Sequence, residues 1–235
     1  MRLRLACALL LVSTVASAES RAFTHAYEYP TLPEGETELA LWHQQSRDVW
    51  DKASAQRFEQ QLQLGLGVTE RLEAALFTVF TQATNEAFAF ASLRGLVRYR
   101  LFDRGSPVDA VIHVEGAKDF GLGIYNLSGE LDLARDLDRI TVVANAIGAL
   151  AMGHDVAAAK LHFEWAAGAT YEVVAKLHAG VETWGSRAGG ITRAEFGPAI
   201  GVQASARVWL ALTAGFGLDA DSDAFSGRLI VGLYR

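Results

Sequence analysis

The chain has 235 residues, of which 51% are hydrophobic and 20% are charged, and its formal net charge is −6. An acidic chain without a clustered basic face lacks the electrostatic signature of nucleic-acid binding, so we expect no nucleic-acid partner. After the first eighteen residues, no apolar run reaches the ~20 residues that a transmembrane helix needs. The composition therefore excludes a helical membrane protein and leaves a soluble periplasmic domain or a membrane β-barrel.

The first eighteen residues have the features of a secretory signal peptide. Arg2 and Arg4 precede an apolar stretch over residues 5–16, and Ala16-Ser17-Ala18 supplies the small residues of a cleavage site. We expect cleavage after Ala18, which leaves residues 19–235 as one mature domain. The only cysteine, Cys7, lies inside the expected signal, so the mature chain has no thiol chemistry. A lipoprotein signal around Cys7 is the weaker alternative, because little apolar sequence precedes it.

Period-two alternation of apolar and polar residues runs through the rest of the chain, in segments of about ten residues. In residues 57–68, Phe58, Leu62 and Leu64 share one face, whereas Glu59, Gln61 and Gln63 lie on the other. Such alternation predicts half-buried antiparallel strands. In chain order, the expected strands lie near 36–46, 57–68, 71–80, 89–101, 108–115, 125–133, 140–150, 160–167, 171–182, 193–203, 207–218 and 225–234. The fold class is therefore all-β, a single antiparallel up-and-down transmembrane β-barrel of about 12 strands (range 10–12).

The connections between these strands predict the direction of the barrel. The expected turns near Thr69, Gly105, Leu137, Ala169 and Ser205 are short. Those near 47–55, 84–86, 118–123, 153–157, 184–192 and 219–223 are mostly longer. Short periplasmic turns and longer external loops are typical of outer-membrane barrels, and an even strand count places both termini in the periplasm.

Aromatic residues on the apolar face form two predicted rows. The candidates for the outer rim are Phe58, Phe80, Tyr125, Phe196, Phe216 and Phe225, and those for the periplasmic rim are Tyr99, Trp165 and Tyr171. Aromatic girdles at both rims are typical of a bilayer interface. A soluble lipocalin-like barrel, with the same apolar face turned inward, is the alternative. Strand count, girdles and loop asymmetry favour the membrane.

Two segments carry a resemblance to known proteins. Residues 29–35, Tyr-Pro-Thr-Leu-Pro-Glu-Gly, precede the strand that starts near residue 36, and residues 63–73 contain the turn Gly-Val-Thr-Glu-Arg-Leu-Glu. Both resemble a broad class of Gram-negative outer-membrane β-barrels, some described as porin-like or as transporters. The resemblance implies an outer-membrane location, contact with outer-membrane lipid and insertion by the barrel-assembly machinery, but it carries over no catalytic residue. Members usually end in an aromatic residue, whereas here Tyr234 is penultimate and is expected to face the lumen.

If the apolar face meets lipid, the charged face lines the lumen. The candidates are Arg94, Arg98, Arg100, His113, Glu115, Glu130, Asp132, Lys160, His162, Glu164, Lys176 and His178. Opposite charges on neighbouring strands could pair and give structural order, or rings of charge could select solutes. Three arginines on one strand suggest a site for an anionic solute, unless Glu115 and other acids neutralise them.

The histidines of the lumen face do not predict a metal site. With a turn centred at Ala169, His162 would face Lys176 and Lys160 would face His178, and an ammonium group repels a cation. We therefore expect no metal and no cofactor. An outer-membrane lipid-modifying enzyme is a rival hypothesis, but it needs a nucleophile and a base on the outer wall. His43 is the main histidine there, so we expect no enzyme.

The sequence thus favours a passive channel or porin-like transporter for small polar or anionic solutes. The alternative is a closed barrel with a structural or surface-binding role, which would use the loops around Trp50 and Trp184.

Overall fold

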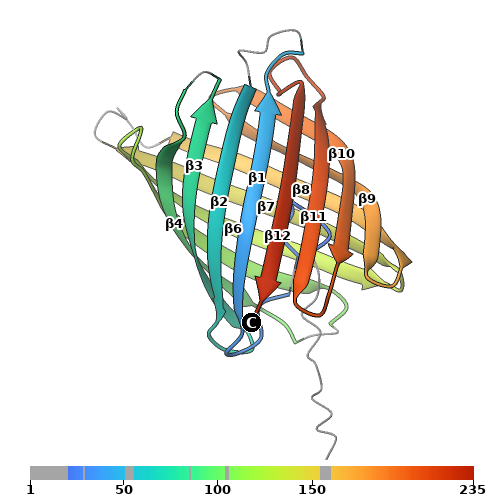
Figure 1. Cartoon of the computed structure of the whole chain (residues 1–235). Helices are drawn as coiled ribbons and strands as arrows, with labels where there is room; N and C mark the ends of the chain where they lie inside the picture. Colours follow the sequence, from blue (N-terminus) through green and yellow to red (C-terminus); the bar gives the residue numbers. More distant parts are fainter. Residues whose placement is uncertain (1–20, 29, 51–55, 85, 104–105, 154–159) are drawn as a thin grey trace, which may run out of the picture.

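The computed structural model describes residues 21–28, 30–50, 56–84, 86–103, 106–153 and 160–235, so the expected signal peptide lies outside the described residues. The described residues form twelve antiparallel strands that close into one barrel, in which β1 pairs with both β2 and β12 (Figure 1). The strands are β1 (Thr37–Arg47), β2 (Gln56–Gly67), β3 (Leu72–Ala83), β4 (Ala89–Arg100), β5 (Asp109–Asp119), β6 (Ile124–Leu137), β7 (Ile140–Gly153), β8 (Lys160–Val174), β9 (Leu177–Ala188), β10 (Ile191–Gln203), β11 (Val208–Gly217) and β12 (Phe225–Tyr234). The predicted fold class and strand number are confirmed. Within the described residues, no helix is long and apolar enough to span a membrane.

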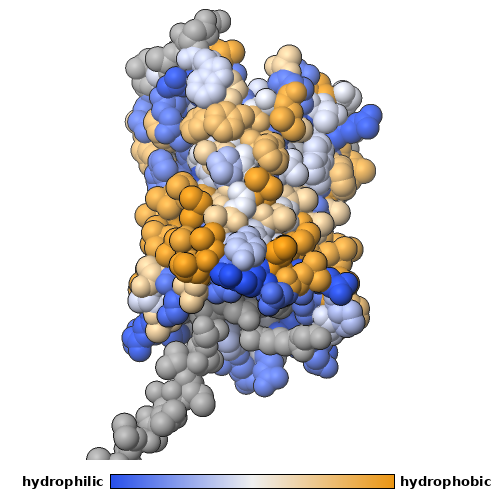
Figure 2. All heavy atoms as spheres, turned by 90° about the vertical axis from the view of Figure 1, so that its right-hand side faces the viewer, coloured by the Kyte–Doolittle hydropathy of each residue, from blue (hydrophilic) through white to orange (hydrophobic). Residues whose placement is uncertain are grey.

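The period-two alternation gives the wall two different faces. Leu62, Leu64 and Leu66 of β2 point outward and are 45–57% exposed, whereas Gln61 and Gln63 are buried inside. The outward leucines of neighbouring strands are cross-strand partners in the sheet, which joins them into a continuous apolar surface. Figure 2 shows hydrophobic side chains over much of one side of this wall, with hydrophilic ones towards its upper and lower ends. An apolar outer surface of this extent suits a lipid environment.

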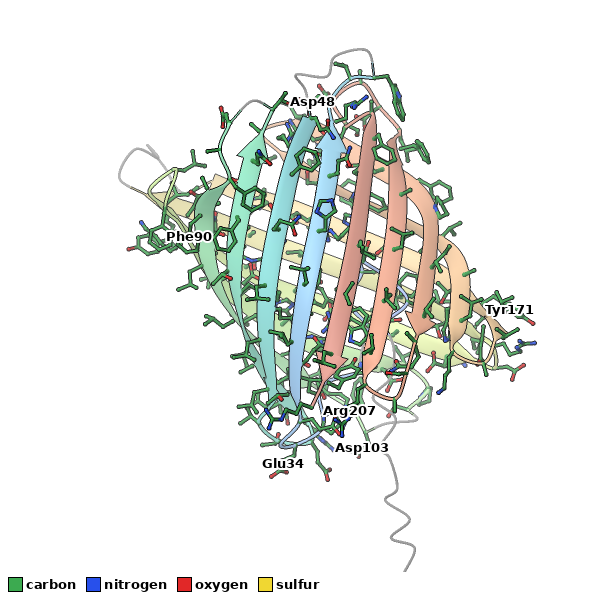
Figure 3. All side chains as sticks on the ribbon, in the orientation of Figure 1. Glu34, Asp48, Phe90, Asp103, Tyr171 and Arg207 are labelled. Atoms are coloured by element: carbon green, nitrogen blue, oxygen red, sulfur yellow. The ribbon has the colours of Figure 1, made fainter. Side chains whose placement is uncertain are left out.

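The connections at the two ends of the barrel differ in length. At the lower end of Figure 1, which also holds the C-terminus, the strand bounds leave 4, 8, 2, 2 and 4 residues between β2 and β3, β4 and β5, β6 and β7, β8 and β9, and β10 and β11. At the upper end they leave 8, 5, 4, 6, 2 and 7 residues between β1 and β2, β3 and β4, β5 and β6, β7 and β8, β9 and β10, and β11 and β12. Charged residues occupy both ends, with Glu34, Asp103 and Arg207 below and Asp48 above (Figure 3). Most of the upper connections are longer, as the sequence predicts.

The turn predicted at Ala169 is wrong. Strand β8 continues through Ala169 to Val174, and the chain reverses at residues 175–176. The small residues Ala167, Gly168 and Ala169 gave the appearance of a turn in the sequence. In the structure Gly168 is a strand residue whose missing side chain makes room inside the barrel, because an added Cβ would lie 2.4 Å from the ring of Phe23.

The predicted external loop at 184–192 is also wrong. Strand β9 extends to Ala188, and Gly189 and Gly190 alone make the turn, with φ angles of 59° and 88°. Two glycines with positive φ are well suited to a two-residue hairpin. Trp184 consequently lies within the strand and is 9% exposed. It faces the interior and is not available for surface binding from a loop.

Outward-facing aromatic residues lie near both the upper and the lower rim of the wall. Phe80, Tyr125, Phe216 and Phe225 lie near the upper ends of their strands, as do Phe58 and Phe196, and Tyr99 and Tyr171 lie near the lower ends. Trp50 packs on Phe216 and Phe225, with ring centroids 6.4 and 5.8 Å apart. Phe90 and Tyr171 point away from the barrel on opposite sides (Figure 3). The expected place of Trp165 at the lower rim is wrong, because β8 is longer than predicted and Trp165 stacks on Phe163 nearer the upper end.

Replacing Leu131 by arginine tests whether the outer wall faces lipid. Leu131 lies at the middle of β6 and is 41% exposed. A cation at the midplane of a membrane barrel costs about 2–4 kcal/mol, so we expect the Leu131→Arg variant to lose that much unfolding free energy in phospholipid vesicles. The measurement is urea unfolding of the folded protein.

The matched control is Leu122→Arg, because Leu122 is 71% exposed in the upper connection 120–123. We expect a change below about 0.5 kcal/mol there, as for an ordinary surface substitution. Equal small effects at both positions would show that the wall faces water.

Candidate functional site

The lumen contains a segment of the chain itself, residues 21–28 and 30–33, which we call the plug. Phe23 is 1% exposed and packs with Ala22 and Ala26 against a cluster on the inner wall that includes Ala134, Val143 and Ala199. Leu32, at the other end of the plug, packs into a second cluster with Trp209, Phe77 and Tyr234. Those two inner-wall regions lie on opposite sides of the lumen, one on strands β6–β10 and the other on strands β1, β3, β4, β11 and β12. The plug therefore crosses the interior of the barrel.

Glycines on the inner wall make the space that the plug occupies. A Cβ added to Gly201 would lie 2.5 Å from the Cα of Ala22, and one added to Gly67 would lie 1.9 Å from the carbonyl oxygen of Pro33. Real side chains do not tolerate such distances, because interiors are packed to near-crystalline density. Glycine at these positions allows close approach of two backbones. The wall and the plug are thus complementary in shape.

A single buried carboxylate holds the upper part of the plug. Glu182, on β9, is 0% exposed and accepts hydrogen bonds from the backbone N–H groups of Thr24, His25 and Ala26 at 3.2, 2.6 and 2.5 Å. The hydroxyl group of Thr213 also donates to it at 2.9 Å. A carboxylate removed from water is costly unless such donors replace the solvent. Glu182 and three consecutive backbone amides of the plug therefore stabilise one another.

The lower part of the plug is held by polar side chains that bind its backbone. Asn145 accepts from the N–H of Tyr27 at 2.9 Å and donates to its carbonyl oxygen at 3.1 Å. Arg98 donates to the carbonyl oxygens of Glu28 and Pro30, the latter at 3.2 Å. Glu73 accepts from the N–H of Leu32 at 3.0 Å. These contacts supply partners for backbone groups that have no strand neighbour.

Two arginine side chains complete the packing of the N-terminal part of the plug. Arg21 lies 3.5 Å from Glu38 and places its guanidinium over the rings of Trp209, Tyr27 and Trp42, at 5.4–6.0 Å from their centroids. Arg228 donates to the carbonyl oxygen of Thr24 at 2.9 Å. Cation–π contacts of this kind are strongest where water is excluded.

Burial shifts the pKa values of two side chains of the plug, Glu28 and His25, towards their neutral forms. Burial raises the pKa of Glu28 to about 8, against a hydrogen bond from the N–H of Ala22 that favours the ionised carboxylate. Burial also lowers the pKa of His25 well below its ordinary value, and the positive charge of Arg228 adds to the effect. The neutral His25 ring stacks flat on Trp184, with centroids 3.7 Å apart. The plug thus places few net charges in the lumen.

A polar cavity of about 430 Å³ lies above the plug, within the upper half of the barrel. We call this space the vestibule. His25 and Tyr27 of the plug form part of its lining, together with wall residues such as Arg94, Glu115 and Asp119. Trp42 and Trp184 add aromatic faces. The vestibule combines both signs of charge with rings, which is suited to small polar molecules.

The three arginines of β4 do not form a common anion site. Arg98 and Arg100 are 1% and 5% exposed, lie below the vestibule, and donate to carbonyl oxygens of Pro30 and Glu70. Arg94 lines the vestibule, where its guanidinium lies 3.6 Å from Glu115 and 4.7 Å from the centre of the Phe77 ring. Glu115 thus offsets the charge of Arg94. The predicted run of three cations is divided between plug binding and the vestibule.

The charged hairpin of β8 and β9 differs from its predicted pairing because the turn is six residues later. His162 pairs with Ala149 of β7 and contacts Glu164 at 3.0 Å in the vestibule. His178 pairs with Glu172 near the lower end, and not with Lys160, the residue at which β8 begins. Lys176 is exposed in the turn, with a φ angle of 72°, and is therefore not a residue of the lumen wall.

Three other predicted lumen residues meet beneath the vestibule. His113 and Glu130 are cross-strand partners on β5 and β6, and Asp132 follows on the same face of β6. All three are buried, with exposures of 4%, 8% and 0%. Register alone brings them together, because antiparallel partners on one face lie about 5 Å apart.

The plug itself was missed in the sequence. Its signals were indirect: Phe23 and Tyr27 occur in a long stretch before the first strand, and Trp42, Trp184 and Trp209 fall on the inner face of the wall. Large rings on the inside of a narrow barrel need an apolar partner. That partner is a segment whose position no local pattern specifies.

Comparisons with known proteins agree on the fold. No protein-family model matches the sequence, and no curated protein matches it. The COG4313 outer membrane channel from Pseudomonas putida F1 is similar in structure, with a TM-score of 0.65 and 12% identity over 91% of this chain and 100% of that one. The NanC porin has a TM-score of 0.62 and 9% identity, over 84% and 98% of the two chains. The KdgM porin in complex with disordered oligogalacturonate has a TM-score of 0.59 and 9% identity, over 84% and 97%.

Replacing Glu182 by glutamine tests whether this carboxylate holds the plug. A charge-assisted hydrogen bond contributes about 1.5–3 kcal/mol, and glutamine loses the charge that several donors share. We expect the plug to leave its seat at least about tenfold more often. The measurement is the rate of maleimide labelling of the thiol introduced by Ala26→Cys, since Ala26 is 5% exposed in the native barrel.

Glu164→Gln is the control, because Glu164 contacts His162 in the vestibule and makes no hydrogen bond to the backbone of the plug within the described part of the chain. We expect the Ala26→Cys protein to be labelled at the same rate with and without the Glu164→Gln substitution. Equal rates in both variants would show that Glu182 is dispensable for seating the plug.

Proposed function

We propose that this protein is a porin-like channel of the outer membrane for small polar solutes, with residues 21–28 and 30–33 as a plug that controls its lumen. The observation that carries the proposal is the closed twelve-strand barrel with an apolar outer wall, whose fold is shared with outer-membrane channels and porins. A wall of this kind satisfies every strand's backbone groups by closure, as a bilayer requires.

The proposed orientation places the lower end in the periplasm. The C-terminus and most of the short turns lie there, and the longer connections lie at the other end. The signal peptide expected at residues 1–18 would deliver the chain to the periplasm, from which the barrel-assembly machinery inserts it. The vestibule then opens towards the outside of the cell.

The lining of the vestibule supports a small polar solute. Arg94, Arg228 and His162 face Glu115, Asp119 and Glu164 across the same space. Paired charges of both signs, with the rings of Trp42 and Trp184, favour a solute that carries several hydrogen-bonding groups. A porin of the same fold has been solved with oligogalacturonate, which is consistent with polar or anionic solutes in barrels of this architecture.

The plug determines which of two functions the barrel has. A solute that enters the vestibule meets His25 and Tyr27 at its base, so transport requires the plug to move. Its many hydrogen bonds to the wall equally favour the second candidate, a barrel that stays closed and serves a structural role. Conductance of the protein in a planar bilayer separates the two.

Replacing Gly201 by leucine is the sharpest test, because a side chain there displaces Arg21 and Ala22 before anything else. Overpacking of this kind costs about 1–3 kcal/mol, so we expect the open time of the channel to rise about 5- to 100-fold over the parent protein. The measurement is single-channel recording in a planar lipid bilayer.

Gly148→Leu is the control, because a Cβ at Gly148 would contact nothing within 4 Å. We expect its conductance to match that of the parent. Persistent silence of the folded Gly201→Leu protein, with thiol labelling that shows the plug displaced, would refute the channel and favour the closed barrel.

A further inference from the structure

The buried cluster beneath the vestibule has the composition of a metal site. His113 Nδ1 lies 3.1 Å from Glu130 Oε2, and one ligand atom from each of His113, Glu130 and Asp132 lies within 4.8 Å of the others. One imidazole and two carboxylates are a common donor set for divalent transition metals. The proposed channel function does not use this cluster.

The ligand atoms have few other partners. Within the described residues, neither ring nitrogen of His113 makes a hydrogen bond, and neither do Oε1 of Glu130 and Oδ2 of Asp132. A buried polar atom left without a partner costs about 1–3 kcal/mol. A proton shared between the two carboxylates would satisfy those oxygens, but it would leave Nε2 of the histidine without a partner and Nδ1 with only its 3.1 Å contact to Glu130, which is misaligned for a hydrogen bond. A bound cation gives a partner to one ring nitrogen of the histidine and to both carboxylates together.

We propose that His113, Glu130 and Asp132 bind one divalent transition-metal ion inside the barrel. The charges of the neighbourhood fit this assignment. Two carboxylates balance the two positive charges of the ion. The nearest other cation is Arg98, whose Nη2 lies 4.0 Å from Asp132 Oδ2, and Arg98 has its own counterion in Glu73, 3.3 Å from its Nη1.

An ion can reach the site from the vestibule, because both His113 and Glu130 are part of the cavity lining. Tyr27 packs edge-on against the imidazole, with centroids 5.2 Å apart, and covers the site on the plug side. Metal ions in proteins are commonly bound at sites that the surrounding side chains shield from bulk water, so that water competes less with the protein ligands.

Asn145, which is not itself one of the three ligands, orients Asp132 and connects the site to the plug. Asn145 donates to Asp132 Oδ1 at 2.6 Å through the same amide nitrogen that donates to the carbonyl oxygen of Tyr27 at 3.1 Å. Outer partners of metal ligands fix the direction of the ligand atom. Ion binding and seating of the plug therefore share Asn145.

The test is zinc binding to the full-length mature protein in detergent, after treatment with a chelator and dialysis. We expect titration calorimetry to show one Zn²⁺ per chain, and Co²⁺ in its place to give visible d–d absorption. His113→Ala and Asp132→Asn should each weaken Zn²⁺ binding at least about 100-fold. Asn145→Ala should weaken it about 10- to 100-fold, as measured for other outer partners.

His162→Ala is the matched control, since His162 also contacts a carboxylate, Glu164, in the vestibule but is more exposed. It should leave zinc affinity unchanged. Folding of each variant is checked by comparing the migration of heated and unheated protein in SDS–polyacrylamide gels. Absence of stoichiometric Zn²⁺ and Co²⁺ binding by the parent protein overturns the proposal, whatever the variants do. So does an equal loss in the His162→Ala and His113→Ala proteins.

These results are independent of the channel proposal. A protein that binds zinc but never conducts retains the metal site and loses the channel, whereas one that conducts without binding zinc does the reverse.

Discussion

The hydrogen bonds between Glu182 and three consecutive backbone amides hold the plug in the lumen, and the packing of the barrel interior depends on them. Without the plug, Glu182 would be a carboxylate on the inner wall with Thr213 as its neighbour, and Gly168 and Gly201 would border empty space. With the plug in place, backbone N–H donors replace the water around the carboxylate. Phe23 and Ala22 occupy the space beside Gly168 and Gly201. The interior is therefore a packed core with a polar cavity above it, and the charged lining acts first on the chain's own backbone.

The two faces of the wall obey different constraints. The outer face needs only apolar side chains of any shape, since lipid adapts to them. The inner face must match one particular segment, and it does so with residues chosen by size and by hydrogen-bonding capacity. Trp42 and Trp209 illustrate this, because their indole N–H groups donate to Gln63 and Glu38 at 3.0 and 3.1 Å while their rings pack on the plug side.

The fold could be predicted because its signal is local. Alternation at period two assigns each strand and its faces without reference to any other part of the chain, and the turn residues near Thr69 and Asp103 confirm the boundaries. The errors at Ala169 and Trp184 have different causes. Gly168 leaves room for the distant Phe23, whereas Gly189 and Gly190 make so tight a turn that β9 continues to Ala188. Local rules interpret the first as a turn and the second as a longer loop. The plug and the grouping of His113 with Glu130 depend on register and long-range packing, which no local pattern contains.

The proposed ion site is coupled to the position of the plug, which is either seated in the lumen or displaced from it. Asn145 can satisfy Tyr27 only while the plug is seated, and it orients Asp132 at the same time. Because coupling between two binding events is reciprocal, an ion that prefers the oriented carboxylate also favours the seated plug, and a displaced plug weakens the ion's site. The charged interior that the sequence presents as a selective pore thereby becomes a means of stabilising the closed state. Its polar residues would then control access to the lumen through the position of the chain's own N-terminal segment.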